Sequence, residues 1–321
     1  MALLVTSGAS ASVSAAQQQT HTSSSLPRLA GQLPSVGSRV SPNTGVSLLC
    51  NFSSSLFTWD ISGLYTTSKG TFVEAENTGQ MGWCSKSGSG MPTMSPPAGA
   101  PSSGYYGMAG IQTSTFGTVV VLDNINGGFY FCFGVVLTSS TAYCSVESNY
   151  ITLPAGFCAT MAAGSCVPLG IALDKKLNLY YADNYNAVVV KCTYASGYKN
   201  CKVIETLSGY PWGLYLDSKG NIWVTDASCA GNVWKNGKSL VTLNDAVEGI
   251  TNSSSNPSKT QHLYIGVTDL CGTYLNAFIF DLTDGNALPS PFSGSNSIPA
   301  ISTTLVFSSL SGAVYQDKDK V

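Results

Sequence analysis

Charge is scarce in this chain. Charged side chains make up 10% of its 321 residues, against roughly 25% in an average protein domain. The formal net charge is −2, and both arginines, Arg28 and Arg39, lie in the first 40 residues. Binding to nucleic acid or to an anionic membrane surface depends on an excess of positive charge, so we predict no nucleic-acid partner. No apolar run reaches the roughly 18 residues of a membrane span, so none is predicted.

Histidines and the common catalytic motifs are scarce too. The chain has two histidines, His21 and His262, and it contains no Cys-x-x-Cys and no Gly-x-Ser-x-Gly sequence. Zinc sites and nucleophilic triads depend on such clusters. We therefore predict no metal site and no cofactor.

Cysteine, by contrast, is plentiful. Ten cysteines in a weakly charged chain indicate a secreted, disulfide-bonded protein, because disulfides persist in oxidising compartments. Short separations favour local bridges and leave the remaining cysteines for each other, although other connectivities stay open. The hypothesised pairs are Cys50–Cys84, Cys132–Cys144, Cys158–Cys166, Cys192–Cys201 and Cys229–Cys271.

The N-terminal segment differs in composition from the rest of the chain. Residues 1–5 form a short apolar run, and residues 13–16 (VSAA) resemble the small-residue site at which a secretory signal is cleaved. The following residues are rich in Ser, Thr, Gln and Pro, as is typical of a linker. We predict an export-signal remnant and linker over residues 1–45, a folded domain over residues 46–321, and a secreted or cell-surface location.

A repeat of 43 residues organises the second half of the chain. Residues 168–183 (PLGIALDKKLNLYYAD) and 211–226 (PWGLYLDSKGNIWVTD) share an initial Pro-x-Gly, a central Asp, an Asn and a terminal Asp. A third copy begins with VEGIT at residue 247, carries a polar insertion, and ends at Asp269, again 43 residues after Asp226. A fixed internal spacing of this kind predicts a repeat architecture.

A fourth copy is expected upstream of these three. Asp123 precedes Phe129 by six residues, as Asp174 precedes Tyr180. Within each repeat, short runs rich in Val, Ile, Tyr and Trp alternate with Gly, Asn and Asp. Four such runs per period of about 43 residues are typical of one blade of a β-propeller.

The length of the folded part predicts the number of blades. Residues 46–321 divided by the repeat length give about six blades. The segment 85–117 is rich in Pro, Gly and Ser, and we interpret it as a long loop. Residues 297–316 are expected to supply the last blade, closed by a strand from near Leu48, because an open ring would expose sheet edges.

The pattern Pro-x-Gly-hydrophobic-x-hydrophobic-Asp, then a turn, Gly or Asn, and a strand ending in Ala/Thr-Asp resembles the NHL repeat. The resemblance covers residues 168–241 well and residues 118–132 and 247–282 less closely. It implies an all-β fold, a six-bladed propeller of four-stranded blades related to gluconolactonase, streptogramin-lyase and strictosidine-synthase-like propellers. Such propellers include enzymes and binding platforms, so the resemblance implies the fold rather than the function.

The resemblance also indicates which residues would line the axial channel. In gluconolactonase-like propellers, polar side chains at the middle of the Pro-x-Gly element help to hold a divalent metal. The matching residues here are Leu169, Trp212 and Glu248, and one carboxylate does not suffice for a hard cation. Glu248 is the candidate catalytic residue, the channel base of a strictosidine-synthase-like site; the reading we favour is a solvated glutamate. Trp212 is the candidate ligand-binding residue, with packing as the favoured alternative.

Three aspartates recur at the end of the second strand of a repeat: Asp183, Asp226 and Asp269. They could form a ring of carboxylates. Because turn residues follow each of them, we instead predict that they cap the next turn, an Asx-type structural role.

These observations favour a secreted, non-catalytic binding or scaffold propeller. Its partner is expected to be a protein, a glycan or another copy of itself, contacted through Tyr, Trp, Ser and Asn. Low charge makes self-association plausible. Two alternatives stay open: a channel-sited lyase or hydrolase that uses Glu248, and a subunit of an extracellular filament or coat.

Overall fold

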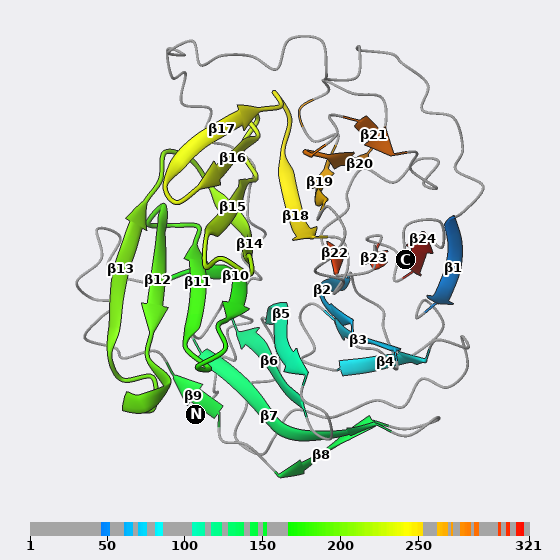
Figure 1. The fold of residues 1–321 in the computed structure, drawn as a ribbon, viewed down its shortest axis with the longest axis vertical. Helices are drawn as coiled ribbons and strands as arrows, with labels where there is room; N and C mark the ends of the chain where they lie inside the picture. The colour runs from blue at the N-terminus through cyan, green and yellow to red at the C-terminus, as the bar shows by residue number, and fades with distance from the viewer. Residues whose placement is uncertain are drawn as a thin grey trace, which may run out of the picture.

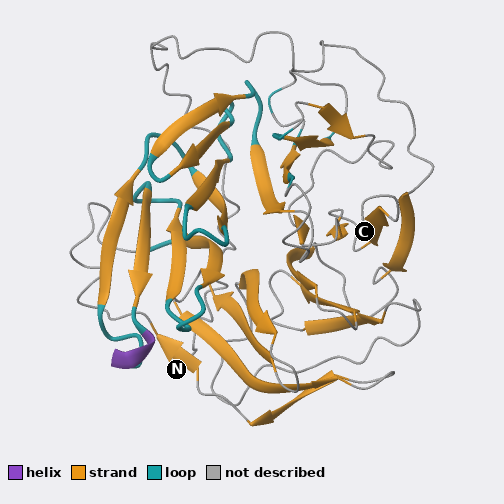
Figure 2. Ribbon diagram, viewed as in Figure 1, coloured by secondary structure: helices purple, strands orange, loops and turns teal. Residues whose placement is uncertain are grey.

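Nearly all the described elements are β-strands (Figure 2). The computed structural model describes residues 166–252, 262–268, 271 and 277–283, and elsewhere only the strands given below. In this part of the chain one helical element occurs, a 3₁₀ turn at Tyr194–Ser196. None of the described helical structure is long and apolar enough to cross a membrane.

The described strands form six antiparallel sheets. The first holds β2 (Ile61–Thr66), β3 (Gly70–Ala75) and β4 (Met81–Ser85). The second holds β5 (Tyr105–Gln112), β6 (Gly117–Asp123), β7 (Gly128–Leu137), β8 (Ala142–Val146) and β9 (Tyr150–Thr152). The third holds β10 (Pro168–Leu173), β11 (Leu179–Asp183), β12 (Val188–Cys192) and β13 (Cys201–Thr206).

The remaining sheets follow in chain order. The fourth holds β14 (Pro211–Leu216), β15 (Ile222–Asp226), β16 (Asn232–Lys235) and β17 (Lys238–Thr242). The fifth holds β18 (Val247–Asn252), β19 (Leu263–Val267), β20 (Phe278–Asp281) and β21 (Asn286–Leu288). The sixth holds β22 (Ile301–Ser302), β23 (Val306–Ser308), β24 (Ala313–Asp317) and β1 (Val46–Asn51).

The six sheets are arranged radially around one axis (Figure 1). Their innermost strands contact each other in a closed circle, in the order β2, β5, β10, β14, β18, β22 and back to β2. This is a β-propeller, and six sheets among the described residues are consistent with the predicted count of about six blades. The last blade combines β1 with three C-terminal strands, and Leu48 pairs with Tyr315 as the expected closing strand.

The register explains the repeat and corrects its outer copies. Pro168 pairs with Asp183 and Pro211 with Asp226, and a bulge follows each pair. The same pattern pairs Tyr105 with Asp123. Asp123 therefore ends the second strand of its blade, like Asp183, and the predicted match of Asp123 with Asp174 was wrong by one strand.

The third copy and the predicted loop also need correction. Val247 pairs with Val267 before the same bulge, so Val267 and not Asp269 stands at the position of Asp226. The polar insertion had hidden this two-residue difference. The segment 85–117, interpreted as a loop, contains the strand β5, whose sequence YYGMAGIQ lies between Gly- and Ser-rich stretches.

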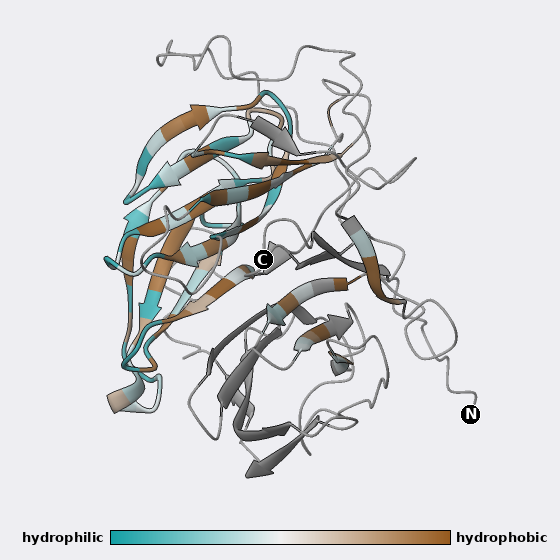
Figure 3. Cartoon of the chain, turned by 45° about the vertical axis from the view of Figure 1, so that its right-hand side comes forward, coloured by the Kyte–Doolittle hydropathy of each residue, from teal (hydrophilic) through white to brown (hydrophobic). Residues whose placement is uncertain are grey.

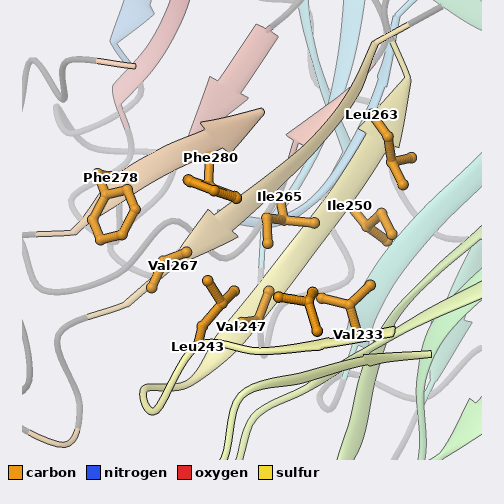
Figure 4. Packing of buried hydrophobic residues seen from close by; sticks show 10 residues of the cluster. Val233, Leu243, Val247, Ile250, Leu263, Ile265, Val267, Phe278 and Phe280 are labelled. Carbon is orange, nitrogen blue, oxygen red and sulfur yellow. The ribbon is translucent and has the colours of Figure 1, made fainter. Parts of the chain in front are cut away.

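The core consists of apolar layers between neighbouring blades. In Figure 4, Val233 and Leu243 of one blade meet Val247, Ile250 and other residues of the next; all belong to one buried cluster. A second cluster joins the β10–β13 sheet to the β14–β17 sheet. Figure 3 shows hydrophobic stretches along strands of these blades. The strand β11 is buried at every position, because successive side chains point to opposite faces and each face packs in a different inter-blade cluster.

Three disulfides join described cysteines: Cys50–Cys84, Cys192–Cys201 and Cys229–Cys271. All three are among the hypothesised pairs. The first ties β1 of the closing blade to β4 of the next, the second joins paired residues of β12 and β13, and the third links two adjacent blades. Cys166 is also disulfide-bonded. The side chains of Cys132, Cys144 and Cys158 lie outside the described residues.

Candidate functional site

The neighbouring blades β10–β13 and β14–β17 have two chemically different ends. Because the strands are antiparallel, the second-to-third strand turns and the linkers to the next blade lie at one end. We call this end the linker face; it consists of residues 184–187, 207–210, 227–231 and 243–246. The opposite end, the turn face, consists of residues 174–178, 193–200, 217–221 and 236–237.

The aspartates that end the second strands support the linker face from inside. Asp183 is fully buried and accepts hydrogen bonds from the main-chain N–H groups of Val167, Tyr185 and Asn186 and from the Asn186 amide. These contacts satisfy the carboxylate through its own turn and through the segment that precedes β10. The structural role predicted for Asp183 is confirmed, and no ring of carboxylates is needed to explain it.

Asp226 repeats this arrangement in the next blade. It is fully buried and accepts hydrogen bonds from the N–H groups of Tyr210 and Ser228, from the Ser228 hydroxyl and from the Asn232 amide. Its partners span the turn and the preceding linker, so one carboxylate holds both in place. Asp269 lies outside the described residues.

Two tyrosines project from this supported surface. The side chain of Tyr185 is 65% exposed and that of Tyr210 is 46% exposed. They come from different blades, but the Asn184 amide donates a hydrogen bond to the Pro211 carbonyl at 3.2 Å and joins the two segments. Tyr185 and Tyr210 thus flank a hydrogen bond that bridges the two blades.

Trp212 lies at the inner side of the same junction. It follows Pro211 directly and is half-buried, and its carbonyl lies against Gly170 of the preceding blade. We call Tyr185, Tyr210 and Trp212 the tyrosine face. The environment of Trp212 is compatible both with packing and with ligand stacking, so its predicted role in binding stays a prediction.

Leu169 and Glu248 occupy the positions equivalent to Trp212 in the neighbouring blades. Leu169 is buried and Glu248 is half-buried. The carbonyl of Glu248 accepts a hydrogen bond from the Thr225 hydroxyl at 2.9 Å, which fixes its main chain against the preceding blade. The predicted catalytic role of Glu248 stays a prediction.

The linker face of these blades carries no exposed charge. Its four segments contain one charged residue, Asp245, which is fully buried and accepts hydrogen bonds from the N–H groups of Ala246 and Cys271. Burial raises the pKa of Tyr181, and the negative charge of the nearby Asp183 carboxylate raises it further, so this phenol stays neutral. Within the described residues, no group of three His, Cys, Asp or Glu side chains could hold a metal. The surface offers phenols and amides for hydrogen bonding and stacking.

One ionisable pair was missed by the sequence analysis. Nδ1 of His262 lies 2.7 Å from Oδ2 of Asp281, which is buried, and the ring stacks on Tyr264. Asp281 also accepts a hydrogen bond from the N–H of Thr283. The pair joins the start of β19 to the end of the neighbouring strand β20. The 19-residue separation gave no signal of the contact.

Comparison with known proteins agrees with this geometry. The family model of the NHL repeat matches residues 209–235, the stretch from the linker before β14 to the end of β16. The chain carries an NHL repeat. Comparison with curated protein sequences gives no match.

Several solved structures are similar to this chain in their fold. A protein of unknown function from Bacteroides thetaiotaomicron has a TM-score of 0.58 and 14% identity over 84% of this chain and 74% of its own. Virginiamycin B lyase from Staphylococcus aureus has a TM-score of 0.53 and 12% identity over 84% of this chain and 98% of its own. A protein described as a gluconolactonase has a TM-score of 0.53 and 11% identity over 86% of this chain and 96% of its own. At these identities the likeness shows the fold alone.

Proposed function

We propose that this protein is a secreted, non-catalytic binding or scaffold propeller whose tyrosine face contacts a protein or glycan partner. The observation that carries the proposal is the pair Tyr185 and Tyr210, both exposed and flanking the Asn184–Pro211 hydrogen bond, on a surface whose turns are held by buried carboxylates. Exposed aromatic side chains with two rotatable bonds supply large contact areas at a small entropic cost. Neutral partners, such as uncharged glycans, suit this surface best.

The hydrogen bonds beneath the tyrosine face support binding by a surface that is already ordered before the partner arrives. Asp183 and Asp226 each hold their own turn and the segment that precedes their blade, and the Asn184–Pro211 hydrogen bond joins the two blades. A surface that is ordered before binding loses little conformational entropy when the partner arrives. The proposal includes association of two copies of this chain through the same tyrosines. Repeated association of this kind would build an extracellular filament or coat, of which this protein would be a subunit.

The test compares tyrosines at opposite ends of the blades. The variant Tyr185→Ala/Tyr210→Ala removes the tyrosine face, whereas Tyr194→Ala removes a phenol of 45% exposure on the turn face. Full-length proteins are titrated with a panel of neutral oligosaccharides and with themselves, followed by calorimetry and sedimentation. We expect the double variant to weaken the interaction about tenfold or more and Tyr194→Ala to leave it unchanged.

Two outcomes contradict the proposal. Equal losses in both variants would mean that the tyrosine face is not the contact. Unchanged binding or self-association in Tyr185→Ala/Tyr210→Ala would mean the same, provided that both variants melt at the temperature of the wild type.

A further inference from the structure

The blade β18–β21 departs from the two preceding blades at the end of its first strand. The last pair of its first ladder joins Asn252 to Leu263, and this register places Asn252 at the position of Leu173 in β10 and of Leu216 in β14. Both leucines pack against apolar clusters between blades. An asparagine at the same position cannot make that apolar contact.

The side chain of Asn252 also differs from the other asparagines that are partly covered. Five other asparagines in residues 166–252 are half-buried, and each of them donates its side-chain amide to a hydrogen bond: Asn178, Asn184, Asn186, Asn221 and Asn232. The side chain of Asn252 is half-buried as well, but it makes no hydrogen bond to a described residue. A polar side chain that neither packs nor pairs breaks a local rule, and functional positions are where such breaks are expected.

The connection that follows Asn252 differs in sequence from the matching turns of the two preceding blades. There, five residues join the first strand to the second, residues 174–178 and 217–221, and each set begins with an Asp that is hydrogen-bonded to its final Asn. In the blade β18–β21, ten residues, 253–262, stand between the two strands, and a serine follows Asn252 directly. The aspartate that organises the other turns has no counterpart at this position.

The residues at this departure form an acceptor sequence for N-linked glycosylation. Residues 252–254 (NSS) have an Asn, a middle residue other than Pro, and a Ser at the third position. Residues 256–258 (NPS) are not an acceptor, because Pro stands in the middle. The chain contains one further acceptor sequence, residues 51–53 (NFS), whose asparagine side chain lies outside the described residues.

We propose that Asn252 carries an N-linked glycan, which is added during export. This inference rests on the export that is part of the proposed function. The co-reactant is an oligosaccharide carried on a lipid pyrophosphate. Nδ2 of Asn252 forms a bond to the anomeric carbon of the oligosaccharide, the bond from that carbon to the pyrophosphate oxygen breaks, and Nδ2 loses one proton as the lipid pyrophosphate leaves. Nothing is oxidised or reduced, and the asparagine remains an uncharged amide.

The position of Asn252 fits the proposed tyrosine face. The strand β18 begins at Val247, beside the linker face, and ends at Asn252, so the glycan leaves the blade at the end opposite the tyrosine face. Charged residues are only 10% of the chain, so electrostatic repulsion does little to keep copies apart. A bulky, hydrated glycan supplies this separation at its own end of the blade and leaves the tyrosine face open to a partner.

The first experiment locates the modification residue by residue. The full chain is secreted from cultured eukaryotic cells behind a host signal sequence and is treated with peptide N-glycosidase in heavy-oxygen water. This treatment converts each glycosylated asparagine into a labelled aspartate, which peptide mass spectrometry assigns to a position. We expect the label at Asn252 and none at Asn256. An unlabelled Asn252 in the secreted chain would overturn the proposal.

Two serine variants form a matched pair that leaves Asn252 in place. Ser254→Ala removes the hydroxyl that the acceptor sequence requires, whereas Ser255→Ala removes the hydroxyl of the next residue, which it does not require. We expect the label at Asn252 to be lost in Ser254→Ala, kept in Ser255→Ala and kept in Ser254→Thr. Equal labelling of Asn252 in Ser254→Ala and Ser255→Ala would overturn the assignment.

A second experiment tests whether position 252 is free of a structural role. Asn252→Leu restores the residue of the two preceding blades and Asn252→Gln keeps the amide, and neither variant can carry the glycan at this position. We expect Asn252→Leu to unfold at a higher urea concentration than Asn252→Gln, because the leucine can pack as Leu173 and Leu216 do. A lower midpoint for Asn252→Leu would mean that the amide serves the fold, and would remove the argument for the glycan.

Binding measurements on the same secreted protein separate this site from the proposed function. A labelled Asn252, together with binding that Tyr185→Ala/Tyr210→Ala leaves unchanged, would support the glycan and contradict the tyrosine face. An unlabelled Asn252, together with binding that the tyrosine variant weakens, would overturn the glycan and leave the tyrosine face in place.

Discussion

The main-chain carbonyl oxygen of Glu248 occupies the space beside Gly213 that a Cβ atom would fill, across the boundary between two blades. The hydroxyl of Thr225 fits into the same contact, accepting a hydrogen bond from the N–H of Gly213 and donating one to the Glu248 carbonyl, both at 2.9 Å. Gly170 has the same relationship to the carbonyl of Trp212 one blade earlier. Glycine in the Pro-x-Gly element thus allows neighbouring inner strands to approach.

A methyl group at position 213 has no space. We expect Gly213→Ala to lower the free energy of unfolding by about 2–3 kcal/mol, because a backbone shift is the only relief. Gly220→Ala is the control: nothing lies near its added Cβ, and its positive φ of 81° predicts a loss of about 1 kcal/mol. Urea denaturation measures both, and an equal or smaller loss in Gly213→Ala would contradict the close approach.

The sequence predicted the propeller because each blade needs the same chemistry at the same place. In residues 168–183 and 211–226 the Pro stands before the bulge, the Gly at the inner-strand contact and the terminal Asp at the cap, so their common spacing is readable in the sequence. The copy at Asp123 was misaligned because an Asp can follow the first strand of a blade, as Asp174 does, or end the second strand. The copy at Asp269 was misaligned because an insertion can preserve a sequence spacing while it shifts the strand register.

The candidate site was less predictable for a physical reason. Nothing in the sequence around Tyr185 or Tyr210 distinguishes these exposed tyrosines from buried ones such as Tyr181. Their exposure depends on the meeting of a turn from one blade with a linker from another, which the Asn184 side chain holds together.

Removing the buried Asp226 carboxylate is expected to lower the free energy of unfolding more than removing an exposed side chain. Asp226→Ala leaves the N–H of Tyr210, the N–H of Ser228 and the amide of Asn232 without their acceptor in a buried setting. We expect a loss of about 3 kcal/mol or more, measured by urea denaturation. Ser208→Ala, an exposed position of the adjoining linker, is the control, with less than about 0.5 kcal/mol expected. Similar losses in the two variants would show that the cap is not a structural anchor.

The turn aspartates predict a dependence of stability on pH. Desolvation acts to raise the pKa of Asp217, but the hydrogen bonds from Asn221, Trp223 and Lys219 outweigh it and lower the pKa. The pKa of Asp174 is lowered in the same way, with a further contribution from Lys191. A lowered pKa in the folded state stabilises the protein above the unfolded pKa of about 4. This stabilisation is lost as the pH falls through the folded value.

The check is a pair of denaturation series at pH 7 and at pH values below about 4, where the unfolded carboxyl becomes protonated. Asp217→Asn is expected to be less stable than the wild type at pH 7, and the difference is expected to shrink in acid. Ser218→Ala, on the exposed part of the same turn, is expected to show no such convergence. A difference between Asp217→Asn and wild type that stays constant with pH would rule out the charge of Asp217 as its cause.

The disulfides Cys229–Cys271 and Cys192–Cys201 close loops of very different length. The first spans 42 residues and joins adjacent blades, whereas the second spans 9 residues within one blade. In the chain-entropy description, the longer loop constrains the unfolded chain more. Replacing both cysteines by serine should therefore cost about 4 kcal/mol for the first pair and about 3 kcal/mol for the second. Denaturation without reductant measures both, and a larger loss in Cys192→Ser/Cys201→Ser would mean that contacts within the blade, and not the tie between blades, dominate the contribution of these bridges.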